Sequence, residues 1–283
     1  MPPRANAAND PAICVVVEDV LLDMREFLAD RDALDVTRFD GPHARRDVME
    51  AVLVQQILHA GGWTNGVAYF PVLSYERSLH ALSTGTADLS ASSLWLVDIE
   101  ARGETVAASA PVLLDGEFVA GFYTLPDNTR ALAATNRVAL RSLRAVSNKS
   151  WIPDWQALER LAPRELNHAP RWENMPRMLQ AGRADFLLAP LQPTQDFSMT
   201  VGGVRLVPIP GIKIALSGTR HYGLSRQSPE ADALRAALDL GLQRFRKEGR
   251  LRRAYEECGF LDPRAAGWTR ITPSYASPAE TPP

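Results

Sequence analysis

The feature that most constrains the fold of this chain is a short pattern that occurs twice. In each copy a helix ends in a turn of small residues, and an aspartate after the turn leads into an apolar strand. The first copy covers residues 80–96 (HALSTGTADLSASSLWL), with Asp88 after the turn, and the second covers residues 178–191 (MLQAGRADFLLAPL), with Asp185. Strands and helices that alternate at this spacing predict βαβ units and a parallel sheet. Because the pattern is doubled, we expect two α/β regions.

The remaining elements are predicted from hydrophobic periodicity and from the glycines and prolines that interrupt it. Strands are expected at residues 12–20, 34–39, 66–72, 87–96, 118–125, 143–147, 186–189, 204–209 and 221–225. Helices are expected at residues 21–29, 46–60, 74–83, 154–161, 173–181, 229–248 and 251–258. The stretch 272–283 is rich in proline, serine and alanine, which predicts a disordered tail.

The composition is that of a soluble globular protein with a core: 283 residues, 46% hydrophobic and 23% charged. A net charge of −2 gives no general attraction to nucleic acid or anionic lipid. No stretch approaches the ~18 consecutive apolar residues of a membrane span. The N-terminus, MPPRANAAND, lacks the apolar region of a signal peptide, although Ala5-Asn6-Ala7 has the form of a signal-peptidase site. It fits a chain trimmed near a mature N-terminus, or a cytoplasmic protein whose first residues are disordered.

Cys14 and Cys258 are the only cysteines of the chain. Two thiols could form one disulfide in an oxidising compartment, or they could be two unrelated buried residues. The sequence leaves both alternatives open.

A third segment, residues 222–259, is considered together with the two copies of the doubled pattern. It contains YGLSRQSPE, then a helix, then RFRKEGRLRRAYEECG. In this order and spacing the three segments resemble the type 2 periplasmic solute-binding proteins of ABC importers, especially the polar amino-acid-binding branch, family 3. The resemblance covers about residues 34–260, and its most specific part is the C-terminal helix with its spaced glycine, leucine, tyrosine and glycine.

The resemblance implies an α/β protein of two lobes, with crossover hinge strands and a central ligand cleft. Lobe one would be discontinuous, at residues 1–122 and 220–283, and lobe two would cover residues 123–219. The function implied is extracytoplasmic binding of a small polar molecule, for an ABC permease or a membrane sensor, by a monomer without cofactor or metal. In an exported protein we expect Cys14 and Cys258 to be bonded or within bonding reach, since both fall in lobe one.

Arg102 is the first ligand contact that the resemblance implies. In the family an arginine that grips the ligand carboxylate stands nine residues before a proline, with a serine two before that proline. Arg102, Ser109 and Pro111 keep this spacing. A guanidinium suits the task because its fixed fork of donors matches a carboxylate. Ile99 stands where the family usually has a threonine, so that helper contact is missing, and a solvated loop arginine is the alternative.

Further contacts are expected from both lobes, each beside an ordinary structural alternative. Serines are common in loops, tryptophans in cores, and an arginine on a helix often pairs with a neighbouring acid. In lobe one the expected contacts are Ser92, Ser93, Trp95 and Arg77, and near the crossovers Tyr123 and Tyr222 are expected to line the hinge.

In lobe two the segment Ser147-Asn148-Lys149-Ser150-Trp151 occupies the position of the family's carboxylate-binding loop. Lys149 and Ser150 would be polar contacts and Trp151 a stacking face, unless the segment only connects a strand to a helix. Pro190 stands where the family's amino-acid binders place an aspartate for the α-ammonium. Proline offers neither charge nor donor. We therefore expect a carboxylate or another polar solute without that amine.

Catalytic motifs are missing from the sequence. The five histidines show no metal-ligand spacing, and there is no Gly-x-Ser-x-Gly elbow, Ser-x-x-Lys or phosphate-binding loop. Some proteins of this fold are dehydratases, so a small-molecule lyase or dehydratase is the alternative to a binding protein. A cytoplasmic effector-sensing domain is another.

Overall fold

The computed structural model describes residues 10–272. The Ala5-Asn6-Ala7 motif and the expected tail beyond Thr272 lie outside this range. Contacts divide the described residues into two compact units: unit 1 comprises 10–114 and 218–261, and unit 2 comprises 115–217 and 262–272. Each unit has its own sheet.

Unit 1 is built on a mixed sheet in the strand order β2-β1-β3-β12-β4, with β5 also paired to β12. Strands β1, β2 and β3 are parallel, as the βαβ pattern predicts, and β12 runs antiparallel to β3, β4 and β5. The bounds are β1 Ala12–Val17, β2 Val67–Val72, β3 Leu89–Ser90, β4 Leu94–Trp95, β5 Val106–Leu113 and β12 Arg220–Ser225.

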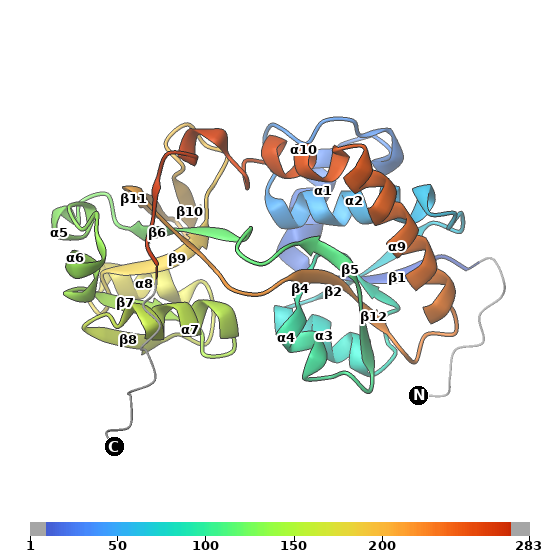
Figure 1. Ribbon diagram of the computed structural model, residues 1–283, viewed down its shortest axis with the longest axis horizontal. Helices are drawn as coiled ribbons and strands as arrows, with labels where there is room; N and C mark the ends of the chain where they lie inside the picture. The colour runs from blue at the N-terminus through green and yellow to red at the C-terminus, as the bar shows by residue number, and fades with distance from the viewer. Residues whose placement is uncertain (1–9, 273–283) are drawn as a thin grey trace, which may run out of the picture. The chain divides into compact units, whose positions relative to one another are not determined.

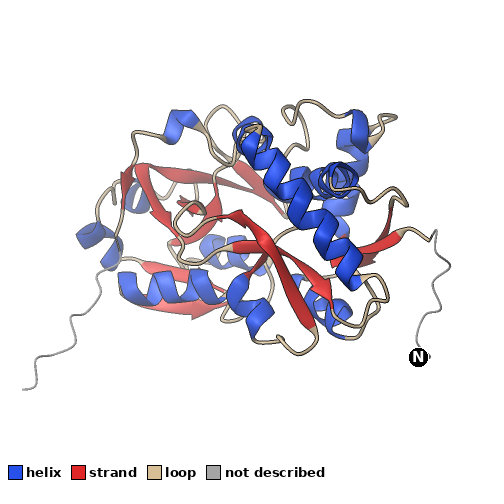
Figure 2. Ribbon diagram, turned by 45° about the vertical axis from the view of Figure 1, so that its right-hand side comes forward, coloured by secondary structure: helices blue, strands red, loops and turns tan. Residues whose placement is uncertain are grey.

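Helices cover both faces of this sheet (Figures 1 and 2). One layer holds α1, α2, α9 and α10, and the opposite layer holds α3 and α4. Helix α2 is buried almost all round because α1, α9 and α10 pack against it. The bounds are α1 Glu18–Leu28, η1 Ala33–Asp35, α2 Arg46–Ala60, α3 Tyr75–Ser83, α4 Leu96–Glu100, α9 Ala231–Lys247 and α10 Arg250–Glu257.

Unit 2 has a sheet in the order β10-β11-β6-β9-β7-β8, with β13 paired to β11. Its strands are β6 Val119–Thr124, β7 Arg144–Ser147, β8 Glu165–His168, β9 Phe186–Pro190, β10 Met199–Val201, β11 Val204–Ala215 and β13 Thr269–Arg270. Its helices are α5 Thr129–Leu132, α6 Arg137–Arg141, α7 Ile152–Leu161, α8 Asn174–Gln180 and η2 Pro263–Ala265.

The C-terminal segment differs from the expected lobe division, which placed everything after residue 220 in lobe one. Residues from Asp262 onward contact unit 2 instead. Strand β13 pairs in parallel with β11, and the Ile271 N–H donates to the Lys213 carbonyl at 2.8 Å. These backbone bonds tie the last described residues to the second sheet.

The doubled sequence pattern has the same structural role in both units. In unit 1 the Ile13 N–H donates to the Asp88 carboxylate at 2.7 Å, and the Asp88 N–H donates back to the Ile13 carbonyl. In unit 2 the Arg144 N–H donates to the Asp185 carboxylate at 2.8 Å, and the Asp185 N–H returns to the Arg144 carbonyl. Each aspartate thus satisfies a backbone donor at the start of the neighbouring parallel strand.

The expected strand at residues 34–39 is wrong. Ala33–Asp35 form a 3₁₀ turn, with the Asp32 side chain accepting from the Leu34 N–H at 2.8 Å. The buried residues are Ala33, Val36 and Phe39, while Leu34 is 44% exposed. Burial every third residue, rather than every second, is what a tight turn against helices requires.

Candidate ligand-binding site

Ser93 lies where the chain passes from β3 to β4 in unit 1, and Glu50 of α2 holds it. The Ser93 N–H donates to Glu50 Oε2 at 2.8 Å, and the Ser93 hydroxyl lies 2.9 and 3.0 Å from the two carboxylate oxygens. The carboxylate also accepts from the Arg46 guanidinium and the Tyr255 hydroxyl, both at 2.7 Å. Glu50 has no solvent exposure, so these donors replace the water that its charge would otherwise need.

Arg220, at the start of β12, extends this group toward Trp95. Its Nε donates to the Ser93 hydroxyl at 2.9 Å, and its Nη2 donates to the Ser93 carbonyl. The guanidinium carbon lies 4.8 Å from the centroid of the Trp95 ring. Arg220 and Trp95 are both buried. Burial, and then the neighbouring Arg46, lower the pKa of Arg220.

Tyr75 connects Trp95 to Asp98 and Arg102. The Tyr75 hydroxyl accepts from the Trp95 N–H at 3.0 Å and donates to Asp98 Oδ2 at 2.7 Å. The Arg102 Nη1 donates to the Asp98 carbonyl at 3.1 Å. Burial raises the pKa of the Asp98 carboxyl, against the opposing effects of Tyr75 and Arg102. We call Glu50, Ser93, Arg220, Trp95, Tyr75, Asp98 and Arg102 the unit 1 polar network.

Arg102 is the member of this network with most capacity left for a ligand. It is half-buried in the turn after α4. Its one bond to a backbone carbonyl uses one of five guanidinium donors. Within residues 10–272 no carboxylate lies within ion-pair distance of it. The arrangement can therefore accept an added anion without displacing an existing ion pair.

The other contacts expected in lobe one do not form one group of side chains available to a ligand. The hydroxyl of half-buried Ser92 donates to the Asp47 carbonyl at 3.0 Å, and the Ser93 hydroxyl is already committed to Glu50 and Arg220. Trp95 packs inside unit 1, and Arg77 is exposed on α3. Ser93 and Trp95 thus shape the polar network from within.

The expected ligand roles of Tyr123 and Tyr222 are wrong, because both side chains have no exposed surface. The Tyr222 hydroxyl donates to the Glu50 carbonyl at 3.0 Å within unit 1. The Tyr123 hydroxyl donates to the Phe197 carbonyl at 2.8 Å within unit 2. Each belongs to the core of its own unit.

The loop that follows β7 in unit 2 does not offer the backbone amides that the resemblance implies. The Lys149 N–H donates to His168 Nδ1 at 3.2 Å, the Ser150 N–H to Asn148 Oδ1 at 2.9 Å, and the Trp151 N–H to the Asn148 carbonyl at 3.0 Å. Pro153, in the first turn of α7, has no N–H to give. A carboxylate would have to replace bonds that already exist.

The side chains of this loop are nevertheless accessible. Lys149 and Ser150 are exposed, and the Lys149 ammonium lies 5.6 Å from the centroid of the Trp155 ring. Trp151 is half-buried and packs against Trp172, with ring centroids 6.0 Å apart at 40°. The loop presents one cation and aromatic surface.

The next expectation concerns the two cysteines of unit 1. Cys14 and Cys258 are free, buried thiols, so the expected disulfide is wrong. Cys14 lies in the sheet on β1, whereas Cys258 follows α10 in the helical layer.

Pro190 is the last residue of β9, and its carbonyl accepts from the Gln192 amide at 2.9 Å and the Tyr123 hydroxyl at 3.3 Å. It supplies acceptors only.

Sequence reasoning missed Glu50 and Arg220, on which the network depends. Glu50 did carry a signal, because it stands in a helix that is apolar on nearly all sides, where a lone carboxylate needs internal donors. Arg220 carried none, since an arginine at the start of a strand is ordinary.

No helix within residues 10–272 is long and apolar enough to cross a membrane. The same residues contain no group of three or more histidine, cysteine or acidic side chains that could hold a metal ion.

No protein-family model matches the chain, and no curated protein matches its sequence. Solved structures do match its fold. The BvgS VFT2 domain of Bordetella pertussis, a double mutant, has a TM-score of 0.53 at 16% identity, over 74% of this chain and 83% of that one. An amino acid ABC transporter substrate-binding protein of Streptococcus pneumoniae, bound to L-arginine, has a TM-score of 0.52 at 18% identity, over 78% and 84%. Substrate-binding domain 2 of GlnP from Lactococcus lactis, in its open conformation, has a TM-score of 0.50 at 11% identity, over 90% and 97%.

The chain therefore has the α/β fold of type 2 periplasmic binding proteins, which confirms the predicted fold class. The neighbours that carry this assignment are amino-acid-binding proteins of ABC transporters and VFT domains.

Proposed function

We propose that this chain is an extracytoplasmic solute-binding protein that holds a small polar molecule bearing a carboxylate and releases it unchanged. It would deliver the solute to an ABC permease or report it to a membrane sensor, and it would act as a monomer without cofactor.

The observation that carries the proposal is the state of Arg102. Arg102 is a half-buried guanidinium with unused donors, and it belongs to a network whose other members are bonded to one another. Guanidinium forks recognise carboxylates by paired hydrogen bonds. The fold neighbour bound to L-arginine supports a ligand of amino-acid size.

Pro190 supports a solute that lacks the α-amine of a standard amino acid, because proline supplies no carboxylate for an ammonium. The amides of residues 149–151 are bonded within the chain, so they are not free to bind the carboxylate. Arg102 is then the main anchor that we propose for the carboxylate.

A thermal-shift screen tests the proposal. Amino acids, simple carboxylates and amines would each be added to the purified chain. A true ligand at about 100 times its Kd adds about 2.7 kcal/mol of stability, which is a visible shift. We expect a hit among the carboxylates, recovered chemically unchanged. Conversion of the hit to another compound would instead support a lyase or dehydratase.

A further inference from the structure

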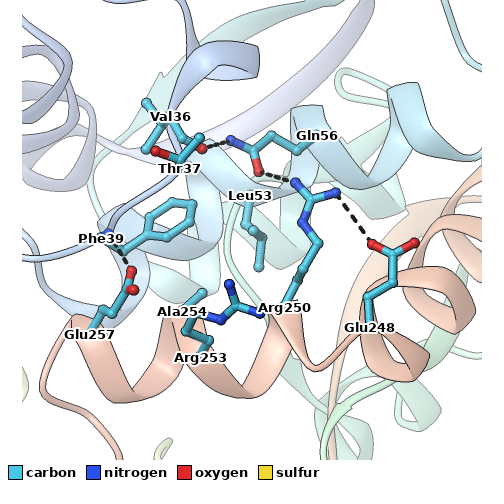
Figure 3. A pocket seen from close by; sticks show the side chains of 10 residues that line it. All are labelled: Val36, Thr37, Phe39, Leu53, Gln56, Glu248, Arg250, Arg253, Ala254 and Glu257. Atoms are coloured by element: carbon cyan, nitrogen blue, oxygen red, sulfur yellow. Dashed lines mark hydrogen bonds and ion pairs between the residues drawn. The ribbon is translucent and has the colours of Figure 1, made fainter.

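A cavity of about 370 Å³ lies in unit 1, and its lining shares no residue with the unit 1 polar network (Figure 3). Its walls come from three segments that are distant in sequence: residues 36–39, helix α2 and helix α10. The volume falls in the range of about 300–1,000 Å³ that is usual for small-molecule sites.

The floor of the cavity is apolar and fixed. Val36, Phe39, Leu53 and Ala254 line it, and each is at most 4% exposed. The Gln56 amide donates to the Val36 carbonyl at 2.7 Å and to the Ala33 carbonyl at 2.6 Å. These two bonds hold the 36–39 segment against α2, so the floor is formed before any ligand arrives.

The rim carries four charged side chains in the order Glu257, Arg253, Arg250 and Glu248 along and just before α10 (Figure 3). Glu257 accepts from the Phe39 N–H at 2.8 Å. Arg250 lies 3.7 Å from Glu248, and its other nitrogen donates to the Gln56 side chain at 3.3 Å. The side chains of Glu257, Arg250 and Glu248 therefore already have partners within the protein.

Arg253 is different. It is exposed at the cavity, and within residues 10–272 its guanidinium has no hydrogen-bond acceptor, ion-pair partner or aromatic ring. The exposed Arg252 beside it on α10 pairs with Glu256 at 2.8 Å and does not line the cavity. The cavity thus combines an apolar floor with one cation that still has its full set of donors.

We propose that this cavity binds a small organic monocarboxylate with an apolar body. The body would cover Leu53 and Phe39, and the carboxylate would take the paired donors of Arg253, a geometry that guanidinium provides. The four rim charges sum to zero, so a monoanion is favoured over a dianion, which the flanking Glu248 and Glu257 would repel. The site lies within unit 1 and shares no residue with the solute site proposed above.

Phenylacetate is a suitable probe, and phenylacetamide is its neutral counterpart. Amide chemical-shift perturbation by NMR on the whole chain would locate binding. We expect phenylacetate to shift the amides of Thr37, Phe39, Arg253 and Ala254 saturably, and phenylacetamide to shift them much less. Because the readout is residue by residue, binding at the unit 1 polar network would be seen separately.

Matched variants decide the role of the arginine. Arg253→Gln should weaken phenylacetate about fivefold (about 1 kcal/mol, as for an exposed ion pair), and Arg252→Gln should leave it unchanged. Thr37→Trp, which fills the cavity from an exposed position, should abolish the shifts. The proposal is overturned if phenylacetate shifts none of these amides at millimolar concentration, or if Arg253→Gln binds it as well as the unaltered chain.

Discussion

Glu50 and Ser93 are joined by three hydrogen-bond contacts of 2.8 to 3.0 Å, although 43 residues separate them in sequence. They tie helix α2 to the passage between β3 and β4. Arg220 approaches the same serine from β12. One buried carboxylate thus fixes three separate parts of unit 1, including the residues that lead to Arg102.

Replacement of Glu50 should be among the most damaging single changes in this chain. Glu50→Ala removes the acceptor for Arg46 and Tyr255 and leaves buried positive charge behind. Breaking a buried charge pair typically costs about 3–5 kcal/mol. Urea unfolding should show a loss of that size. Glu256→Ala, which breaks an exposed pair with Arg252, should cost about 1 kcal/mol or less. Equal losses in the two variants would contradict the structural role of Glu50.

Gly241 permits the close contact between α9 and α2. A Cβ atom at Gly241 would overlap the Ile57 carbonyl oxygen, which belongs to a backbone that cannot move aside alone. Gly241→Ala should therefore destabilise the chain by about 1–3 kcal/mol, as overpacking does. Gly267 has open space around its Cβ position, so Gly267→Ala is the control and should leave the unfolding midpoint nearly unchanged. A neutral Gly241→Ala would show that the two helices lie farther apart.

His221 gives stability a defined pH dependence. Its Nδ1–H donates to the Ser109 carbonyl, and its Nε2 lies within hydrogen-bond distance of the Thr219 hydroxyl, both at 2.7 Å. Burial lowers the pKa of His221, although the Ser109 bond opposes the shift. Below about pH 6.5 the unfolded chain takes up a proton that the folded chain does not, so the free energy of unfolding falls.

This contribution is fully present above about pH 6.5 and declines as the pH drops toward the lowered pKa of the folded state. Urea titrations between neutral and mildly acidic pH would measure it. His221→Gln should flatten the pH dependence, while His80→Gln, at an exposed position on α3, should not. An unchanged slope in His221→Gln would exclude this residue as its source.

The two thiols should be unreactive in the folded chain. Burial raises the pKa of Cys258 to about 12 and raises that of Cys14 well above its ordinary value, with Asp88 adding to the effect at Cys14. Because the thiolate is the reactive form, labelling with Ellman's reagent should be slow until urea unfolds the protein. Two thiols should then titrate. Rapid labelling of the folded chain, or no free thiol after unfolding, would contradict the structure.

Local patterns predicted most of the framework. The doubled aspartate pattern placed β3 and β9 correctly because the same residue that marks the pattern also anchors the neighbouring strand. The helical spacing at residues 46–60 gave α2 with its bounds. The 34–39 segment failed because apolar residues three apart can be mistaken for strand alternation when a short segment contains few of them.

The site was less predictable than the framework. The family resemblance implied Arg102, whose ligand role stays a prediction, whereas Glu50 and Arg220 act through partners brought together only by folding. The ligand roles expected for Tyr123 and Tyr222 were wrong because a sequence does not show whether a tyrosine hydroxyl faces a ligand or donates to a carbonyl inside the core. A sequence also does not show which backbone amides of a loop are already bonded, as the Lys149 N–H is to His168.

Isothermal titration of the solute found by thermal shift, against the unaltered chain and Arg102→Ala, tests the proposed binding role most directly. Arg252→Ala serves as the control, since it removes an exposed arginine elsewhere in unit 1. The account predicts that Arg102→Ala weakens binding of the carboxylate by more than ~1.5 kcal/mol, about tenfold or more, with no change in Arg252→Ala. Equal affinity in all three proteins, or a best ligand that is purely cationic, would contradict it.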